Sequence, residues 1–175
     1  MEKLEYKYIN GWFGFESYYN KIANNFLKDG MNILEMGVFD GKSAIEMARH
    51  IKSKSLRINF YLIDRWSEDI DYDRFSKNIV DCNVFDVVIP IRCDSIKASI
   101  KFNEYYFDFI FIDGDHSYEN VKNDIQAWYP KLKVNGIMAG DDYDPCHNGV
   151  IKAVDEMFGN SISKEWPVWY IKKTE

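Results

Sequence analysis

Short apolar runs alternate along this chain with segments whose apolar residues recur at helical spacing, and this alternation restricts the fold most. A strand–helix–strand order predicts right-handed crossovers and a parallel sheet with helices on both faces. The expected strands are residues 32–36, 58–63, 87–91, 107–112, 137–140 and 168–172, with 161–164 paired to the last. The expected helices are residues 41–52, part of 69–82, 95–102, 117–129 and 149–158. We therefore expect a Rossmann-like, doubly wound α/β fold with a mostly parallel seven-stranded sheet.

Local signals add three details to this prediction. Pro90 lacks a backbone N–H, so the strand that contains it is expected at an edge of the sheet. Residues 133–136 are expected to form a turn before the strand 137–140. Residues 1–28 form a helical cap segment, in which the side chains at helical spacing are Phe15, Tyr18, Tyr19, Ile22 and Phe26. The helix is expected over one edge of the sheet or over the mouth of the cofactor site.

The composition fits a single domain spanning residues 1–175, with 46% apolar and 29% charged residues. A net charge of −6 without a cluster of Lys and Arg argues against nucleic-acid binding. The three cysteines lack CxxC spacing and are interpreted as free thiols in a reducing compartment. The first residues show no apolar leader, and no apolar run approaches the roughly 20 residues of a membrane span. We therefore expect a cytoplasmic protein without a membrane partner.

The turn after the first strand carries the most informative residues for function. It runs from Glu35 to Ser43, in the part of an open α/β sheet where ligands bind beyond the carboxyl ends of the strands. Gly37 permits a tight turn and a close approach of the backbone to a ligand. Gly41 opens a helix whose N-terminus offers N–H groups to an anion, and Ser43 adds a hydroxyl group.

The spacing distinguishes this turn from two phosphate-binding motifs. Its glycines do not form GxGxxG, the bulky Phe39 is unsuited to that motif, and GxxxxGK[ST] is absent. The Glu35 carboxylate would repel a phosphate but suits an amine or hydroxyl donor. Asp64 ends the second strand, where an acid commonly accepts from a ribose diol. The pattern favours a nucleoside that carries an amino acid, and a helix-entry turn without a ligand is the alternative.

These residues resemble the first motif of the class I S-adenosylmethionine-dependent methyltransferases. The form ExGxxxGxS is similar to that of the catechol and caffeoyl-CoA O-methyltransferases and lacks the middle glycine of ExGxGxG. Later stretches are similar, in order, to a bacterial branch that includes antibiotic-sugar O-methyltransferases: residues 111–119, 132–136, 140–143 and 149–158. The resemblance covers nearly the whole chain. It implies S-adenosylmethionine as cofactor and methyl transfer to a small hydroxylated acceptor, such as a sugar or natural product.

The resemblance also implies roles for individual residues. The methionine portion of the cofactor would be contacted by Glu35, Gly37, Ser43 and Phe39. The ribose would be bound by Asp64, and the adenine would be contacted by Trp66, Asp94 and Ser95. Gly41 and Asp113 belong to the same cofactor set. In the metal-dependent members, one divalent cation such as Mg²⁺ is bound at the positions of Asp113, Asp141 and Asp142.

Carboxylates at the ends of two neighbouring strands indicate a cation independently of the resemblance. Asp113 and Asp141 follow the fourth and fifth strands and are expected on one rim of the sheet, near Asp142, Asp115 and Asp144. When carboxylates lie this close together, either the pKa of one of them is raised or a cation is bound between them. Oxygen ligands favour Mg²⁺, Ca²⁺ or Mn²⁺ over Zn²⁺. The alternative is a solvated acidic loop.

Transfer of a methyl group to a hydroxyl also requires a base. His116 stands where the related catechol enzymes carry a catalytic Lys, and a neutral imidazole accepts protons near neutral pH. Asp115 is the rival base because some sugar methyltransferases use that position, and helix capping is the alternative for His116. His147 is interpreted as a loop residue near the same rim, and His50 is given no function.

Two other functions stay open for this sequence. An NAD-type Rossmann oxidoreductase is disfavoured by the absent GxGxxG. A module that binds S-adenosylmethionine without catalysis would carry the same first motif. The short N-terminal segment leaves the acceptor pocket either open or completed by a second subunit of a homo-oligomer.

Overall fold

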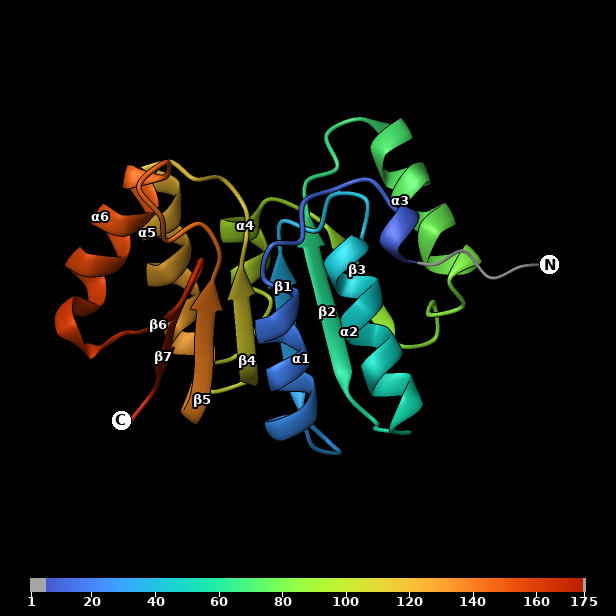
Figure 1. The fold of residues 1–175 in the computed structure, drawn as a ribbon, viewed down its shortest axis with the longest axis horizontal. Coiled ribbons are helices and arrows are strands. Elements are labelled where there is room, and N and C mark those ends of the chain that lie inside the picture. Colours follow the sequence, from blue (N-terminus) through green and yellow to red (C-terminus); the bar gives the residue numbers. More distant parts are fainter. Residues whose placement is uncertain (1–5, 175) are drawn as a thin grey trace.

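The computed structural model describes residues 6–174, so residues 1–5 of the expected cap segment and Glu175 lie outside the described part. One seven-stranded sheet has the order β3-β2-β1-β4-β5-β7-β6 (Figure 1). The strands are β1 (Asn32–Met36), β2 (Asn59–Asp64), β3 (Val88–Arg92), β4 (Phe107–Ile112), β5 (Leu132–Gly140), β6 (Ser163–Glu165) and β7 (Val168–Lys172). Strands β1 to β5 are parallel, and β7 pairs antiparallel with β5 and β6. The predicted fold class is therefore confirmed.

Helices cover both faces of this sheet, as the alternating pattern predicts. They are α1 (Glu16–Asn25), α2 (Lys42–Ser53), α3 (Asp69–Asp81), α4 (Ser95–Ser99), α5 (Tyr118–Trp128) and α6 (Asn148–Phe158). One apolar core unites buried residues of α1, α2 and α3 with one face, and a second unites α4, α5 and α6 with the other. Figure 1 shows α1 and α2 in front of the sheet. No helix within residues 6–174 has the length and apolar character needed to cross a bilayer.

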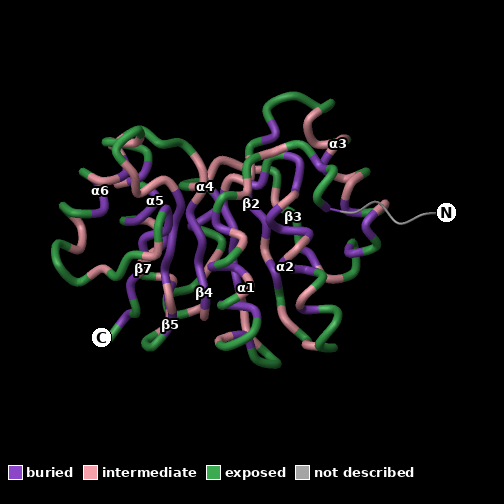
Figure 2. Tube along the Cα trace, in the orientation of Figure 1, coloured by how far each residue is buried: buried purple, intermediate pink, exposed green. Residues whose placement is uncertain are grey.

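Alternation along the central strands assigns their side chains to the two cores. In β1, Ile33 belongs to the core under α1 and α2, whereas Leu34 and Met36 belong to the core under α4, α5 and α6. Both layers are fully buried at the centre of the sheet, where Figure 2 shows purple strands between helices with exposed outer faces. The same alternation points the side chain of Glu35 toward α1 and α2, which matters for the site.

The N-terminal segment lies elsewhere than its apolar pattern predicts. Helix α1 packs on a sheet face, where Phe15 and Tyr19 contact the ring of Phe111 in β4 at centroid distances of 4.5 and 4.8 Å. Before α1, the chain crosses the carboxyl ends of the central strands (Figure 1). Lys42 of α2 donates to the carbonyl of Gly11 in this crossing loop at 3.2 Å. The loop, rather than the helix, therefore lies near the mouth of the expected site.

The fifth strand begins earlier than expected, and this corrects the predicted turn at residues 133–136. These residues belong to β5, which carries an irregularity in its pairing with β4 between Phe107 and Phe109. Asn135 takes a positive φ of 67° and donates its N–H to the carbonyl of Lys173 at 2.7 Å. An Asn-Gly pair that reads as a turn is here a bulge within a strand. Pro90 lies in β3 at the edge of the sheet, as predicted.

Candidate functional site

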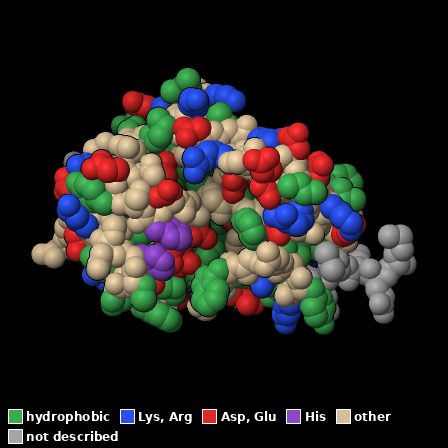
Figure 3. Space-filling model, turned by 90° about the horizontal axis from the view of Figure 1, so that it is seen from above, with side chains coloured by type: hydrophobic (Ala, Val, Ile, Leu, Met, Phe, Trp, Pro, Cys, Tyr) green, Lys and Arg blue, Asp and Glu red, His purple; other side chains and the backbone are tan. Residues whose placement is uncertain are grey.

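The site lies at the carboxyl ends of the parallel strands, where the strand order reverses between β1 and β4. Figure 3 looks down on this end and shows a hollow with acidic side chains around it and a pair of histidines beside it. A cavity of about 370 Å³ is lined by residues that follow β1, β2, β3 and β4 and by α5. A second cavity of about 250 Å³ lies against the crossing loop, at Gly11 and Trp12. Gly37, Phe39 and Asp113 line both, so the two cavities adjoin.

Gly37 is required by the close approach of two chain segments. Its φ is +81°, and a Cβ atom at this position would lie 1.8 Å from the carbonyl oxygen of Asp113. The backbone N–H of Gly37 donates to Ile63 in β2 at 3.0 Å. The predicted tight turn therefore brings the ends of β1, β2 and β4 together. Gly41 also has a positive φ, at +90°, and packs against the ring of Phe75. Its N–H donates to the carbonyl of Val38 at 2.9 Å, within the turn itself.

Glu35 supports the turn from beneath. Its side chain is 1% exposed and accepts hydrogen bonds from the hydroxyl of Ser43 at 2.5 Å and from that of Tyr19 at 2.9 Å. Burial raises the pKa of Glu35 to about 7, against the two hydrogen bonds, which lower it. The residue joins β1 to α1 and α2 and is absent from the lining of the two cavities described above. Of these two hydrogen-bonded residues, both predicted to contact the cofactor, only Ser43 lines a cavity, the smaller one.

Asp64 connects the turns that follow β1 and β2. One carboxylate oxygen accepts from the backbone N–H of Phe39 at 2.8 Å, and the other accepts from that of Trp66 at 2.9 Å. Asp64 and Phe39 both line the larger cavity, where a ribose diol was predicted to bind. The carboxylate keeps lone pairs for a further donor because each oxygen accepts one of these bonds.

Trp66 does not lie beside the larger cavity, contrary to its predicted place beside the adenine. Its ring is 3% exposed and packs on Phe75 at a centroid distance of 4.4 Å. Its indole N–H donates to the carbonyl of Phe39 at 2.8 Å. Trp66 has a positive φ of 37°, and the neighbouring Arg65 lines the cavity instead.

The far end of the larger cavity holds Asp94, Ser95 and a residue that sequence reasoning missed. Asp94 caps α4 by accepting from the N–H of Lys97, and both predicted residues line the cavity. Ser95 donates to the carboxylate of Asp124 in α5 at 2.5 Å. Burial raises the pKa of Asp124 to about 6. The whole of β4 and part of α5 lie between Asp94 and Asp124 in the sequence. No local pattern therefore indicates that Asp124 lies close to Asp94 and Ser95.

Asp113, which lines both cavities, gathers with two further carboxylates, as the order of the strands predicts. Oxygen atoms of Asp113, Asp141 and Asp142 lie within 4.8 Å of one another. Burial, with Asp141 and Asp142 nearby, raises the pKa of Asp113 well above its ordinary value, and burial raises that of Asp141 to about 6. The buried oxygen Oδ1 of Asp141 has no hydrogen-bond partner among the described residues. An unpaired buried oxygen among carboxylates fits a divalent cation as the missing partner.

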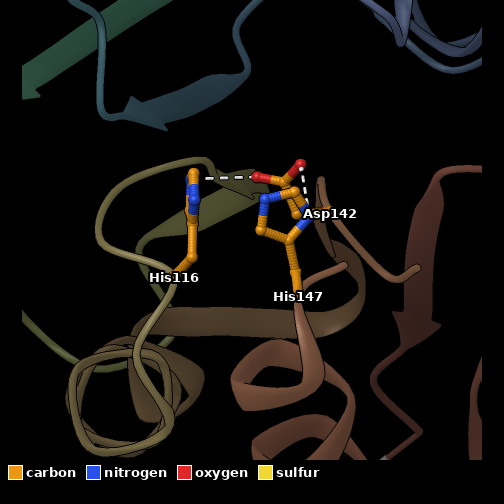
Figure 4. A group of neighbouring side chains, drawn as sticks. All are labelled: His116, Asp142 and His147. Carbon is orange, nitrogen blue, oxygen red and sulfur yellow. Dashed lines mark ion pairs between the residues drawn. The ribbon is translucent and has the colours of Figure 1, made fainter. Parts of the chain in front are cut away.

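Two histidines lie beside the carboxylate of Asp142 (Figure 4). Nε2 of His116 lies 2.9 Å from one carboxylate oxygen of Asp142, and Nδ1 of His147 lies 3.4 Å from the other. The histidine rings contact each other edge to face at a centroid distance of 4.9 Å. His147 therefore belongs to the rim cluster, although its sequence position favours a loop role. His50 lies on α2, hydrogen-bonded to Asn20 at 2.6 Å.

The two predicted bases differ in their surroundings. Asp115 lines the larger cavity, and side-chain and backbone hydrogen bonds of Ser117 lower its pKa to about 2. A carboxylate that holds its proton so weakly is a poor base for a hydroxyl group. His116 is oriented by a carboxylate, as catalytic imidazoles commonly are, and its side chain is 45% exposed.

Comparison with known proteins places the chain in a family. The model of a family described as "Methyltransferase domain" matches residues 34–143. An uncharacterized protein of Acanthamoeba polyphaga mimivirus is 31% identical over 123 residues, which is 70% of this chain and 56% of that protein. The chain thus spans little more than half the length of this relative.

Solved structures share the fold over nearly the whole chain. A SAM-dependent O-methyltransferase from Thermotoga maritima has a TM-score of 0.70 at 17% identity, covering 95% of this chain and 68% of that one. A TDP-rhamnose 3′-O-methyltransferase of calicheamicin biosynthesis has a TM-score of 0.66 at 16% identity, covering 89% and 76%. The resemblance drawn from the sequence is confirmed. The chain belongs to the methyltransferase-domain family.

Proposed function

We propose that this chain is an S-adenosylmethionine-dependent O-methyltransferase that uses a divalent cation and acts on a small hydroxylated acceptor such as a sugar. The observation that carries the proposal is the position of Asp113. It lines both adjoining cavities and also belongs to the three-carboxylate group with Asp141 and Asp142. One residue thus joins the cavities suited to the cofactor with a carboxylate group suited to a cation that would bind the acceptor hydroxyl. The fold shared with O-methyltransferases supports the same function.

The lining of the two cavities supports S-adenosylmethionine as the cofactor. Asp64 would accept from the ribose, and Asp94 with Ser95 would contact the adenine in the larger cavity. The amino-acid portion would enter the smaller cavity, where the ammonium group of Lys42 donates one hydrogen bond to Gly11 and keeps further N–H donors for the carboxylate of the cofactor. The cofactor carries a net positive charge, which suits an acidic lining.

The carboxylates and His116 have separate tasks in this proposal. When bound, the cofactor supplies an electrophilic methyl group, and the cation lowers the pKa of an acceptor hydroxyl. Asp113, Asp141 and Asp142 would hold the cation. His116 would take the hydroxyl proton while Asp142 holds its imidazole in place. Orienting the oxygen in line with the methyl group accounts for much of the lowered barrier.

Exposed aromatic side chains beside the smaller cavity support a ring-shaped acceptor. The indole of Trp12 lines this cavity but is 84% exposed, so a broad aromatic face is open to solvent. The ring of Phe39 also lines this cavity and is 48% exposed. Large exposed aromatics rarely cluster without a ligand or partner, and sugar rings stack on such faces.

Calorimetric titration with S-adenosylmethionine tests the cofactor assignment. We expect binding to wild-type protein and at least about tenfold weaker binding to Asp64→Ala. Asp86→Ala is the matched control because Asp86 is a half-exposed carboxylate paired with Lys52, outside the cavities described above. Failure of folded wild-type protein to bind would refute the proposal.

Transfer of a labelled methyl group to a panel of sugars and phenols tests the catalytic assignment. We expect activity with Mg²⁺, loss of activity with EDTA, and loss in Asp141→Ala. Full activity in EDTA and in Asp141→Ala would refute the role of the metal. An inactive Asp115→Asn together with a fully active His116→Ala would assign the base to Asp115. Cofactor binding without transfer to any member of the panel would identify a binding module.

A further inference from the structure

The two histidines beside Asp142 come from separate parts of the chain and converge on one carboxylate. His116 follows β4, Asp142 follows β5, and His147 directly precedes α6. One nitrogen from each imidazole and one oxygen of Asp142 all lie within 4.8 Å of one another. Figure 4 shows each ring beside a different oxygen of the carboxylate, with dashed lines joining them to it. The proposed methyltransferase uses His116 alone of the two, so the convergence of His147 has no place in that function.

We propose that His116, Asp142 and His147 form a binding site for a transition-metal dication of the Zn²⁺ or Co²⁺ class. Two imidazole nitrogens with one carboxylate oxygen are a donor set that such ions favour, whereas Mg²⁺ favours oxygen alone. The site therefore differs in selectivity from the neighbouring group of Asp113, Asp141 and Asp142, although the two share Asp142.

The distances fit a three-ligand site with small adjustments. Bonds of about 2.0–2.1 Å in a tetrahedral zinc site place ligand atoms about 3.4 Å apart. His116 lies 2.9 Å from one oxygen of Asp142 and His147 lies 3.4 Å from the other, and the ligand atoms of the three residues lie within 4.8 Å of one another. Side-chain rotations that change these separations by at most about 1.4 Å would therefore form the site.

Exposure and neighbouring charge also suit an ion at this place. The side chains of His116 and His147 are 45% and 31% exposed, which leaves a path for the ion and room for water as fourth ligand. The carboxylate of Asp144 lies 3.2 Å from Nδ1 of His147. Asp144 competes for this nitrogen in the free protein and supplies a nearby negative charge in the loaded one.

Occupation of this site has a consequence that rests on the proposed function. An ion bound to His116 removes the imidazole lone pair that would accept the hydroxyl proton. Zn²⁺ is therefore expected to inhibit methyl transfer in the presence of Mg²⁺. Binding of the ion itself does not depend on methyl transfer, so the two claims fail separately.

Titration with Co²⁺ and competition with a chromophoric Zn²⁺ chelator test the site directly. We expect visible d–d absorption bands of Co²⁺ in wild-type protein. Both His116→Asn and His147→Asn are expected to lose these bands and to bind Zn²⁺ at least about tenfold more weakly. His50→Asn is the matched control because His50 lies on α2 with Asn20 and Glu46 as its neighbours.

The outcomes separate this site from the carboxylate group. Circular dichroism melts establish that each variant is folded before its affinity is measured. Asp141→Asn is expected to keep the Co²⁺ bands, since Asp141 belongs only to the carboxylate group. Equal Zn²⁺ affinity in wild-type protein and His147→Asn, or an equal loss in His50→Asn, would overturn the proposal. Intact Zn²⁺ binding without inhibition of transfer would refute only the role of His116 as base.

Discussion

Replacement of Gly37 by alanine tests whether the first turn depends on contact between backbones. The carbonyl oxygen of Asp113 lies 1.8 Å from the position of the new Cβ atom, and the Cα of Gly114 lies 2.8 Å from it. The N–H of Asp113 donates to Met36 of β1 at 2.9 Å, so the two strand ends are also hydrogen-bonded. The clash is therefore with backbone that cannot rotate away.

Two terms determine the expected loss of stability in Gly37→Ala. The positive φ of +81° costs an alanine about 1 kcal/mol. Relief of the clash requires a shift of about 1.2 Å, from 1.8 Å to the 3.0 Å of the tightest real contacts. Overpacking of this kind costs about 1–3 kcal/mol. We expect the free energy of unfolding to fall by about 3 kcal/mol in total.

Gly30→Ala is the control that isolates the backbone term. Gly30 has a similar φ of +83°, and no atom lies within 4 Å of its added Cβ. Urea unfolding followed by circular dichroism should give a loss of about 1 kcal/mol for Gly30→Ala and about 3 kcal/mol for Gly37→Ala. Equal losses in the two variants would refute the reasoning from close approach. Cofactor binding, if measured in parallel, should weaken only in Gly37→Ala.

Three further predictions follow from the hydrogen bonds and pKa values of the site. Tyr19→Phe should lower the free energy of unfolding by about 1–2 kcal/mol. The loss should be larger at pH 8 than at pH 5, because Glu35, which accepts the hydrogen bond of Tyr19, ionises with a pKa of about 7. Tyr18→Phe should be nearly neutral in the same urea assay, since the buried hydroxyl of Tyr18 has no partner among residues 6–174. Burial raises the pKa of Asp124 to about 6, so its contribution to stability is fully present below about pH 4 and lost as the pH rises through 6. The free energy of unfolding of Asp124→Asn relative to the wild type, measured in urea, should therefore rise by about 2 kcal/mol from pH 4 to pH 8. A difference that stays the same at the two pH values would contradict the assignment. Asp64→Asn should lower the free energy of unfolding by about 1–2 kcal/mol in that assay, because an amide supplies one acceptor oxygen where the carboxylate supplies two to the backbone N–H groups. An unchanged free energy of unfolding would show that the two turns are stable without these hydrogen bonds.

The strands were predictable wherever a continuous apolar run is bounded by turn residues. The bounds 32–36, 107–112 and 168–172 agree with β1, β4 and β7 residue for residue. The start of β5 was not predictable because Asn135 and Gly136 carry the local signal of a turn. Two backbone hydrogen bonds with Lys173, which directly follows β7, instead hold them in the sheet: Asn135 donates to Lys173, and Lys173 donates to Gly136. Tertiary pairing here overrides a local preference.

Topology predicted which strand ends meet but not where every side chain points. Asp113 and Asp141 adjoin because β4 and β5 are neighbours, and this follows from the order of elements alone. The ring of Trp66 is held by packing on Phe75 and by a hydrogen bond to Phe39, both contacts of a loop residue. The contact of Asp124 with Ser95 joins two helices that are separated by β4 in the chain. Such details require the packed structure because no periodic pattern encodes them.

Glu35 shows how a motif residue can serve a site without lining it. Strand alternation turns its carboxylate toward the core of Ile33, where Ser43 of α2 and Tyr19 of α1 donate to its two oxygens. A buried carboxylate without such donors would be strongly destabilising, so the turn and the N-terminal helix must be in place together. The segment expected to be a separate cap is thereby part of the support of the first turn. A change in α1 that displaces Tyr19 should disturb the cavities above the turn, although α1 itself lies on the face of the sheet.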